Sequence, residues 1–125
     1  MKKENRLKKR KEFAYIFKKG EAISARHLVL TYTKSKLKNY KVGFSCGKKV
    51  GIAVVRNKVK RRIKEAVYFY RYNIKSGYNY IFVAKQNASM ASFEEIKSEF
   101  EFLLKKANVF VENQWKFLLK LSPIQ

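Results

Sequence analysis

Hydrophobic residues recur at helical spacing in three parts of the chain. In residues 9–19 (KRKEFAYIFKK), Phe13, Ile16 and Phe17 fall at i, i+3 and i+4, and a glycine follows the last turn. This pattern predicts a short amphipathic helix. A second, longer stretch with apolar residues three and four positions apart predicts a central helix over residues 53–72.

The third helix is predicted to begin at a capping box, because Ser92 is followed three residues later by Glu95. Its apolar stripe comprises Ile96, Phe100, Leu103, Leu104 and Ala107. Residues 108–125 are expected to form a C-terminal extension, in which Phe110, Trp115 and Leu118 suggest one more helix.

Three other stretches have the composition or alternation of strands. Residues 27–34 (HLVLTYTK) and 78–85 (YNYIFVAK) are rich in β-branched and aromatic residues. Residues 40–47 alternate, with Val42, Phe44 and Cys46 on one face and three small residues, Gly43, Ser45 and Gly47, on the face left open for close approach. The order of elements is α-β-β-α-β-α. We therefore expect a single domain over 1–125, of the α+β class, built as an α/β sandwich.

One flank of the central helix is uniformly cationic. At about 100° per residue, the core-facing stripe is Val59, Ile63, Ala66, Val67 and Tyr70, and the polar band beside it is Arg56, Asn57, Lys60, Arg61 and Lys64. Arg56, Lys60 and Lys64 form a like-charge ladder, which destabilises an isolated helix. Lys48 and Lys49 add charge shortly before the helix. A solvated helix face is the alternative, but solvated faces normally mix signs, so we predict phosphate binding here.

The charge of the whole chain favours the same interpretation. The formal net charge is +21, and positions 22–64 contain no carboxylate. Self-repulsion of this size opposes compaction, so a polyanionic partner is expected. A single cysteine, Cys46, indicates a reducing compartment, and no apolar run is long enough to span a membrane. We expect a cytoplasmic protein with no membrane partner.

Residues suited to catalysis are scarce. All nine acids are Glu, and His27 is the sole histidine, at the start of a predicted strand, where it is expected to be structural or solvated. The one acidic cluster, Glu94–Glu101, is interleaved with Lys97 on a helix and is expected to be surface charge, so no metal site is predicted. No Ser-His-Asp set is possible without Asp. We expect neither catalytic residues nor a cofactor bound by this chain.

Residues 48–66, KKVGIAVVRNKVKRRIKEA, resemble the signature of the bacterial ribonuclease P protein subunit. The family motif is Arg-Asn, two residues, Lys-Arg, two residues, Arg. Arg56-Asn57 and Lys60-Arg61 match it in identity, and Lys64 stands in place of the last Arg. Residues 5–20 are similar to the family's first helix, and YIFVAK with the helix at Ser92 is similar to its final βα unit. The resemblance covers residues 5–107.

This resemblance implies a fold like the second domain of ribosomal protein S5, with four strands and a left-handed βαβ crossover that departs from the usual handedness. It implies a subunit of a ribonucleoprotein that removes the 5′ leader of precursor tRNA, with the catalytic Mg²⁺ ions in the RNA subunit. The RNA-binding residues carried over are Lys48, Lys49, Arg56, Asn57, Lys60, Arg61 and Lys64.

The resemblance also implies a central cleft, floored by the sheet and bordered by the first helix, that holds the leader. Phe13 and Phe17 match aromatic residues that could stack on leader bases. Packing in the core is the alternative for both, and Phe17 is expected to be the more buried. Thr31 stands where the family often has a cleft aromatic, and alternation points Tyr32 to the other face.

Two other functions remain open on the sequence. A ribosomal or other structural RNA-binding protein would also carry this charge and fold class. A DNA-binding architectural module is a third possibility, but no helix-turn-helix, zinc-finger or homeodomain pattern supports it, and we expect no DNA partner.

Overall fold

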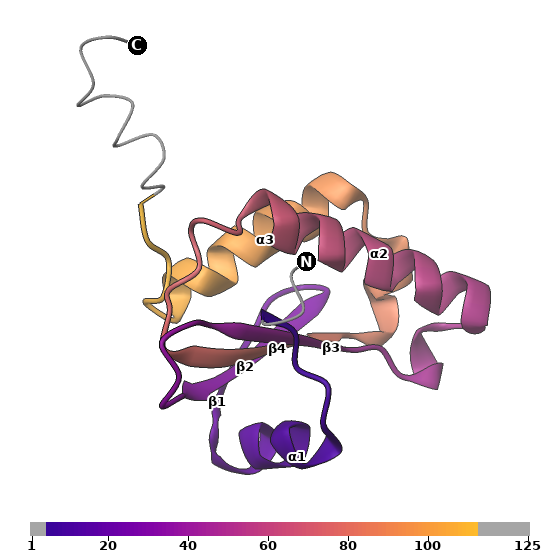
Figure 1. The fold of residues 1–125 in the computed structure, drawn as a ribbon. Helices are drawn as coiled ribbons and strands as arrows, with labels where there is room; N and C mark the ends of the chain where they lie inside the picture. The colour runs from indigo at the N-terminus through magenta and orange to yellow at the C-terminus, as the bar shows by residue number, and fades with distance from the viewer. Residues whose placement is uncertain (1–4, 113–125) are drawn as a thin grey trace, which may run out of the picture.

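The computed structural model describes residues 5–112, which form a four-stranded sheet between two layers of helices (Figure 1). The strands are β1 (Glu21–Ser24), β2 (Leu28–Lys34), β3 (Lys41–Ser45) and β4 (Tyr78–Ala84), in the order β1-β2-β4-β3. Helix α1 (Arg10–Lys19) lies on one face of the sheet, and α2 (Ala53–Phe69) and α3 (Phe93–Lys106) lie on the other. Two 3₁₀ turns, η2 (Lys48–Val50) and η3 (Gln86–Met90), precede α2 and α3.

The predicted fold class is confirmed, an α+β sandwich. β1 and β4 each pair antiparallel with β2, whereas β3 pairs parallel with β4. Because α2 connects the parallel neighbours β3 and β4, these three elements form a βαβ crossover. This topology agrees with the crossover of the S5-like fold.

The strand that the hydrophobic pattern did not predict is β1. Its four residues, EAIS, include only one half-buried side chain, Ile23, so they carry no alternation to detect. The strand exists because it pairs with β2, with Glu21 opposite Tyr32 and Ser24 opposite Val29. The Tyr32 hydroxyl donates a hydrogen bond of 2.9 Å to the Glu21 carboxylate across this pair. Pairing with β2, and not the intrinsic strand propensity of its residues, therefore forms this edge strand of the sheet.

The main core fills the space between the sheet and the helices α2 and α3. β2 and β4 present alternate residues to it, among them Leu28, Leu30, Tyr80 and Phe82, which are fully buried. The ring of Phe100 stacks on Phe82 with the ring centroids 4.2 Å apart. This alternation is the period-2 burial expected for a strand covered on one face by helices.

A smaller hydrophobic cluster lies under α1 on the opposite face. Its buried members are Leu7, Ile16 and Ile81, with Phe13 packed against them. Gly43 of β3 allows this contact, because a Cβ atom there would lie 2.5 Å from Cζ of Phe13. The prediction that the small residues of β3 permit close approach is therefore confirmed at this position, and the approaching group is the protein's own α1.

The central helix and the segment after α3 differ from the prediction. α2 ends at Phe69 rather than at residue 72, because the chain turns there to bury Ile74 and return to β4. Val109 is buried in the main core, and Phe110 forms an antiparallel bridge with Ile74. One more helix was suggested around Phe110, Trp115 and Leu118. Phe110 lies in the bridge and not in a helix, so the prediction is wrong at that residue, and Trp115 and Leu118 lie outside the described residues. None of the helices in residues 5–112 is long and apolar enough to cross a membrane.

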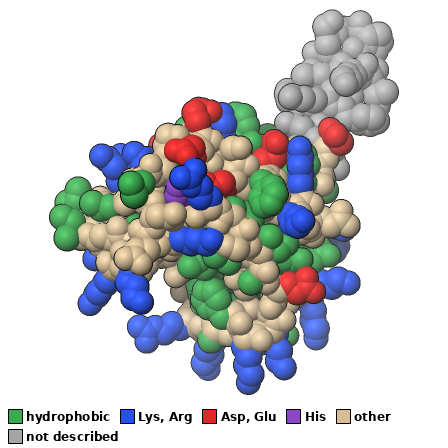
Figure 2. Space-filling view, turned by 180° about the vertical axis from the view of Figure 1, so that it is seen from behind, with side chains coloured by type: hydrophobic (Ala, Val, Ile, Leu, Met, Phe, Trp, Pro, Cys, Tyr) green, Lys and Arg blue, Asp and Glu red, His purple; other side chains and the backbone are tan. Residues whose placement is uncertain are grey.

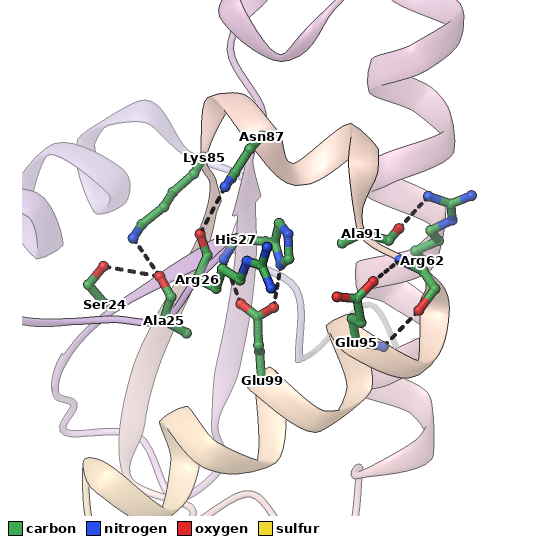
Figure 3. Close-up of polar contacts among 11 residues, drawn as sticks. Ser24, Ala25, Arg26, His27, Arg62, Lys85, Asn87, Ala91, Glu95 and Glu99 are labelled. Carbon is green, nitrogen blue, oxygen red and sulfur yellow. Dashed lines mark hydrogen bonds and ion pairs between the residues drawn. The ribbon is translucent and has the colours of Figure 1, made fainter.

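The turn between β1 and β2 is tied to α3 by buried polar contacts (Figure 3). The Glu99 carboxylate accepts hydrogen bonds from the backbone N–H of His27 at 2.7 Å and from its Nδ1 at 2.5 Å. The Lys85 ammonium donates to the Ala25 carbonyl in the same turn. The single histidine, which is only 4% exposed, therefore has a structural partner, as one of the sequence alternatives predicted.

Candidate nucleic-acid interface

The apolar stripe predicted for α2 is buried, and this orients the rest of the helix. Its members Val59, Ile63, Ala66 and Val67, with Tyr70 just beyond the helix, all lie in the main core. Because the stripe faces the sheet and α3, the polar band must face outward. Asn57, Arg61 and Lys64 are exposed, and Arg56 and Lys60 are half-buried.

The half-buried flank lies beside the end of β3. The Cys46 thiol lies near the Arg56 carbonyl, at 3.9 Å. Burial raises the pKa of this thiol, and the positive charges of Lys60 and Arg56 oppose that rise. Arg62 belongs to the opposite flank, where its guanidinium donates a hydrogen bond of 2.8 Å to the Ala91 carbonyl.

Two further cations precede the helix on η2. Lys48 and Lys49 are exposed, and Val50 between them and α2 is buried and anchors the turn. Gly51 then has φ of 156°, a backbone conformation that other residues rarely adopt, and leads into α2. The structure thus brings the predicted RNA-binding residues onto one continuous segment, from η2 along the outer side of α2.

The cations of α2 have no acidic partners within the described chain. The ion pairs among residues 5–112 join His27 to Glu99, Lys41 to Glu12, Lys97 to Glu94 and Lys105 to Glu101, and none of them involves α2. The Nε atom of Arg56 is buried and has no hydrogen-bond acceptor. Six cationic side chains on one helix therefore keep their charge uncompensated by the protein itself.

The residues predicted to bind the leader lie on the other face of the sheet, under or on α1 (Figure 1). Thr31 points to this face but is only 5% exposed, between Ala22 of β1 and Ile81 of β4. Tyr32 points to the opposite face, as alternation predicted. The sheet separates these residues from the outer side of α2, so the two groups of predicted site residues do not form one pocket.

The expected order of burial of the two phenylalanines is wrong. Phe13 packs over Gly43 in the smaller cluster, whereas Phe17 is 48% exposed. The sequence places both at helical spacing, but Ile16 between them takes the fully buried position, and Phe17 lies at the rim. Their ring centroids are 6.5 Å apart, so Phe17 extends an aromatic surface from Phe13 toward solvent.

Acidic and basic side chains are distributed unevenly over the surface. On the side of the molecule drawn in Figure 2, most carboxylates lie in the upper part around the histidine, and Lys and Arg side chains line the lower rim. The acidic side belongs to α3, which carries Glu94, Glu95, Glu99 and Glu101. No three His, Cys, Asp or Glu side chains within residues 5–112 come together in a group that could hold a metal ion.

An exposed aromatic group at the end of α2 was not predicted. Tyr68 and Tyr72 are 60% and 55% exposed, and the Arg71 guanidinium lies over both rings, 3.9 Å and 4.6 Å from their centroids. The sequence feature that could have indicated this exposed group is the aromatic run YFYRY at 68–72. Of these five residues, only Tyr70 was predicted, as a member of the core-facing stripe.

The fold and this basic helix define a class, the small α+β sandwiches that present a cationic crossover helix. Comparison with known proteins identifies the family: the ribonuclease P family model matches residues 1–108, so the chain belongs to that family. Members of the family are protein components of an endoribonuclease complex that processes tRNA.

Individual relatives are similar over most of their length. A ribonuclease P protein component from Clostridium botulinum is 39% identical over 112 residues, which cover 86% of this chain and 98% of the relative. One from Bacillus velezensis is 39% identical over 117 residues, covering 93% and 100%. The structure of a Staphylococcus aureus RNase P protein mutant matches with a TM-score of 0.81 at 35% identity, covering 86% of this chain and 92% of that one. The Thermotoga maritima RNase P protein matches with a TM-score of 0.74 at 26% identity, covering 81% and 96%.

Proposed function

We propose that this chain binds the RNA subunit of ribonuclease P through η2 and the outer side of α2, and the 5′ leader of precursor tRNA through the α1 face of the sheet. In this proposal the two RNAs contact opposite faces of one small sheet. The protein supports removal of the leader by holding the substrate and the RNA subunit together.

The observation that carries the proposal is the uncompensated charge of α2. Arg61 and Lys64 are exposed, and neither has an ion-pair partner among residues 5–112. The first turn of α2 contains no acid, although the positive end of the helix dipole favours one there. An RNA phosphate supplies the missing negative charge, because Arg and Lys release counterions when they neutralise phosphates.

The proposal for the leader rests on the aromatic pair of α1. Phe17 offers an exposed ring, and Phe13 supports it from inside the smaller cluster. Single-stranded RNA is bound by stacking its bases on such rings and by cations near its backbone. Lys18 and Lys19 in the last turn of α1 are exposed and supply those cations.

The chemistry of cleavage is assigned in this proposal to the RNA subunit and its Mg²⁺ ions. The carboxylates of α3 have other partners, since that of Glu95 accepts from the Ser92 backbone N–H and that of Glu99 accepts from His27. Within residues 5–112 no three His, Cys, Asp or Glu side chains form a group that could hold a metal ion, and this supports placing the Mg²⁺ ions in the RNA.

The first test measures affinity for the ribonuclease P RNA at several salt concentrations. Arg61→Ala should weaken binding and reduce the slope of log K against log salt by about one, because one phosphate contact is lost. The matched control is Lys105→Ala on α3, where the cation is already paired with Glu101 at 3.2 Å. The control should leave the slope unchanged.

Two results contradict this assignment. Equal slopes for Arg61→Ala and the wild type would show that Arg61 contacts no phosphate. RNA that copurifies with the tagged protein should be dominated by one large non-ribosomal transcript. Recovery of ribosomal RNA alone would instead support the alternative, a ribosomal or other structural RNA-binding protein.

The second test separates leader binding from RNA-subunit binding. Phe17→Ala should lower the affinity of the reconstituted complex for leader-bearing precursor tRNA, about 5-fold or more if one stacked base is lost, and leave affinity for mature tRNA unchanged. Tyr15→Ala is the control, because Tyr15 is 58% exposed on the same helix but lies about 160° around the helix axis from Phe17. A similar loss in both variants, or for both tRNAs, contradicts the assignment.

A further inference from the structure

The exposed residues at the C-terminal end of α2 form an ordered stack, which we call the aromatic clamp: Tyr68, Arg71 and Tyr72. The Arg71 guanidinium lies over both tyrosine rings, with its central carbon 3.9 Å from one centroid and 4.6 Å from the other. Its Nη1 also donates a hydrogen bond of 2.6 Å to the Tyr68 carbonyl. The guanidinium is therefore held in place between the rings before any partner binds.

The two tyrosine rings of the clamp are not packed in the core, whereas the Arg71 side chain also caps the end of α2 through the Tyr68 carbonyl. Tyr68 and Tyr72 are each more than half exposed, so neither ring is needed to fill the core. Arg71 forms no ion pair in that part of the chain. Core packing at this end of α2 comes from Tyr70, whose ring stacks on Phe100. Exposed aromatic rings grouped around an uncompensated cation indicate a binding surface.

The position of the clamp indicates what it binds. Asn57, Arg61, Lys64 and Tyr68 follow one another at spacings of four and three residues, so they lie on one side of α2, within about 60° of arc. The basic band thus runs directly into the clamp, about 10 Å from Arg61 to Tyr68 along the helix axis. A ligand that follows the cations along the helix reaches the aromatic rings next.

We infer that the aromatic clamp stacks on unpaired bases of the same RNA whose phosphates bind the basic band of α2. This inference rests on the proposed function, and it adds a base-stacking element to a surface otherwise described by charge alone. Aromatic rings and guanidinium planes both stack on bases exposed in loops and bulges, whereas paired bases inside a helix are not available to them. The chemical class recognised is therefore RNA with single-stranded bases, with little preference for sequence.

A second copy of the chain fits this surface less well. A two-fold contact through the clamp would place Arg71 and Lys64 of one copy against the same cations of the other. One carboxylate, Glu65, lies a turn away on α2, and with a net charge of +21 per chain a single acid per copy is outnumbered by the cations around it. RNA brings the opposite charge and the stacking partner together.

The experiment compares two double variants in binding to the ribonuclease P RNA. Tyr68→Ala with Tyr72→Ala should weaken binding about 5- to 100-fold and leave the salt slope unchanged, because stacking is lost but no phosphate contact is lost. Tyr68→Phe with Tyr72→Phe keeps both rings and should bind within about twofold of the wild type. Phe102→Ala, which removes a 50% exposed aromatic ring from α3, is the matched control and should have no effect.

A second probe tests whether the bases must be unpaired. Binding of the alanine double variant to a fully paired RNA duplex should equal that of the wild type, because a duplex offers no free bases. Arg71→Lys keeps the charge but loses the planar group between the rings, so it should weaken binding to the ribonuclease P RNA at an unchanged slope. Thermal unfolding of each variant shows whether the fold is retained. Arg71→Lys remains a test even where the alanine variant is unstable.

The inference and the proposed function fail in different ways. If Arg61→Ala lowers the salt slope but the tyrosine and Arg71 variants bind as the wild type does, the clamp does not stack and only the inference is overturned. A loss that is equal on the duplex also overturns it. Sedimentation that shows a dimer dissociated by Tyr68→Ala, with RNA affinity unchanged, would assign the clamp to self-association. Failure of the wild type to prefer the ribonuclease P RNA overturns both.

Discussion

Helices α2 and α3 lie side by side on the same face of the sheet, and both bury an apolar stripe in the main core (Figure 1). They differ in whether their polar groups have hydrogen-bond or ion-pair partners within the protein. α3 begins with a capping box in which the backbone N–H of Glu95 donates to the Ser92 hydroxyl at 3.1 Å. α2 begins at Ile52 with no side-chain cap and no acid in its first turn.

The charges of the two helices show the same contrast. On α3, Glu99 accepts hydrogen bonds from His27, and Glu101 accepts them from Tyr70 at 3.1 Å and from Lys105 at 3.2 Å. On α2, the Arg56–Lys60–Lys64 ladder repels itself, and no acid within residues 5–112 pairs with it. The acids of α3 have partners within the protein, whereas the cations of α2 have no acidic partner among residues 5–112. The RNA-binding surface proposed for α2 rests on this difference more than on the total charge.

The largest change in stability is expected when a buried hydrogen-bond acceptor on α3 is removed. Glu99→Ala should lower the free energy of unfolding by about 2–3 kcal/mol, because the backbone N–H and Nδ1 of the buried His27 lose their acceptor. Urea unfolding near neutral pH measures this change. Glu94→Ala is the control, since this exposed carboxylate makes only a 3.5 Å ion pair with Lys97, and surface pairs of this kind contribute little. Similar losses for both variants would remove the contrast between buried and surface partners on α3.

A smaller change in stability, in the opposite direction, is expected when one cation of α2 is removed. Lys60→Gln should raise the free energy of unfolding by about 0.5 kcal/mol at low salt, because it relieves like-charge repulsion with Arg56 and Lys64. The gain should shrink at high salt, where the charges are screened. The same variant should bind the ribonuclease P RNA more weakly. A loss of stability at low salt would mean that Lys60 has a stabilising partner, and the comparison with α3 would then break down.

The smallest expected effect is a dependence on pH at the start of α3. The hydrogen bond from the Ser92 backbone N–H holds the pKa of Glu95 below its usual value of 4.5. A lowered pKa in the folded state contributes stability above about pH 4.5, and that contribution is lost as the pH falls through the folded-state pKa. Glu95→Gln keeps a capping acceptor but cannot titrate.

Unfolding measured between pH 3 and pH 6 should therefore show a slightly shallower pH dependence for Glu95→Gln than for the wild type. The difference between the two proteins should narrow as the pH is lowered. A constant difference across this range would indicate that Glu95 titrates alike in the folded and unfolded chains.

Most helices and strands could be predicted from local pattern because burial imposes a period on the residues that make them. The stripe from Val59 to Tyr70 is buried as predicted, and the box at Ser92 caps α3. β1 could not be found in this way, since a short edge strand is stabilised by the strand beside it. The relative burial of Phe13 and Phe17 also escaped prediction, because helical spacing does not specify which side of a stripe lies over Gly43.

The candidate site residues also fall into two groups, those whose placement local pattern predicts and those whose placement depends on tertiary contacts. The motif residues Arg56, Asn57, Lys60 and Arg61 lie on one flank of α2 by helix geometry, so their position beside a buried stripe could be predicted, although only Asn57 and Arg61 of the four are exposed. The separation of Phe17 from these residues by the sheet, and the stacking of Arg71 between two tyrosines, depend on contacts that no local pattern encodes.

The amino-acid sequence by itself determined the fold class, the approximate positions of α1, α2 and α3 along the chain, and a cationic side on α2. It did so because hydrophobic period and charge are properties of neighbouring residues. The Glu94–Lys97 and Glu101–Lys105 pairs of α3 are local and follow from helical spacing. Only the tertiary structure decided which charges are also paired with groups distant in sequence, as Glu99 and His27 are across 72 positions. The cations of α2 have no such pairing within the described chain, and that makes them the candidate RNA surface.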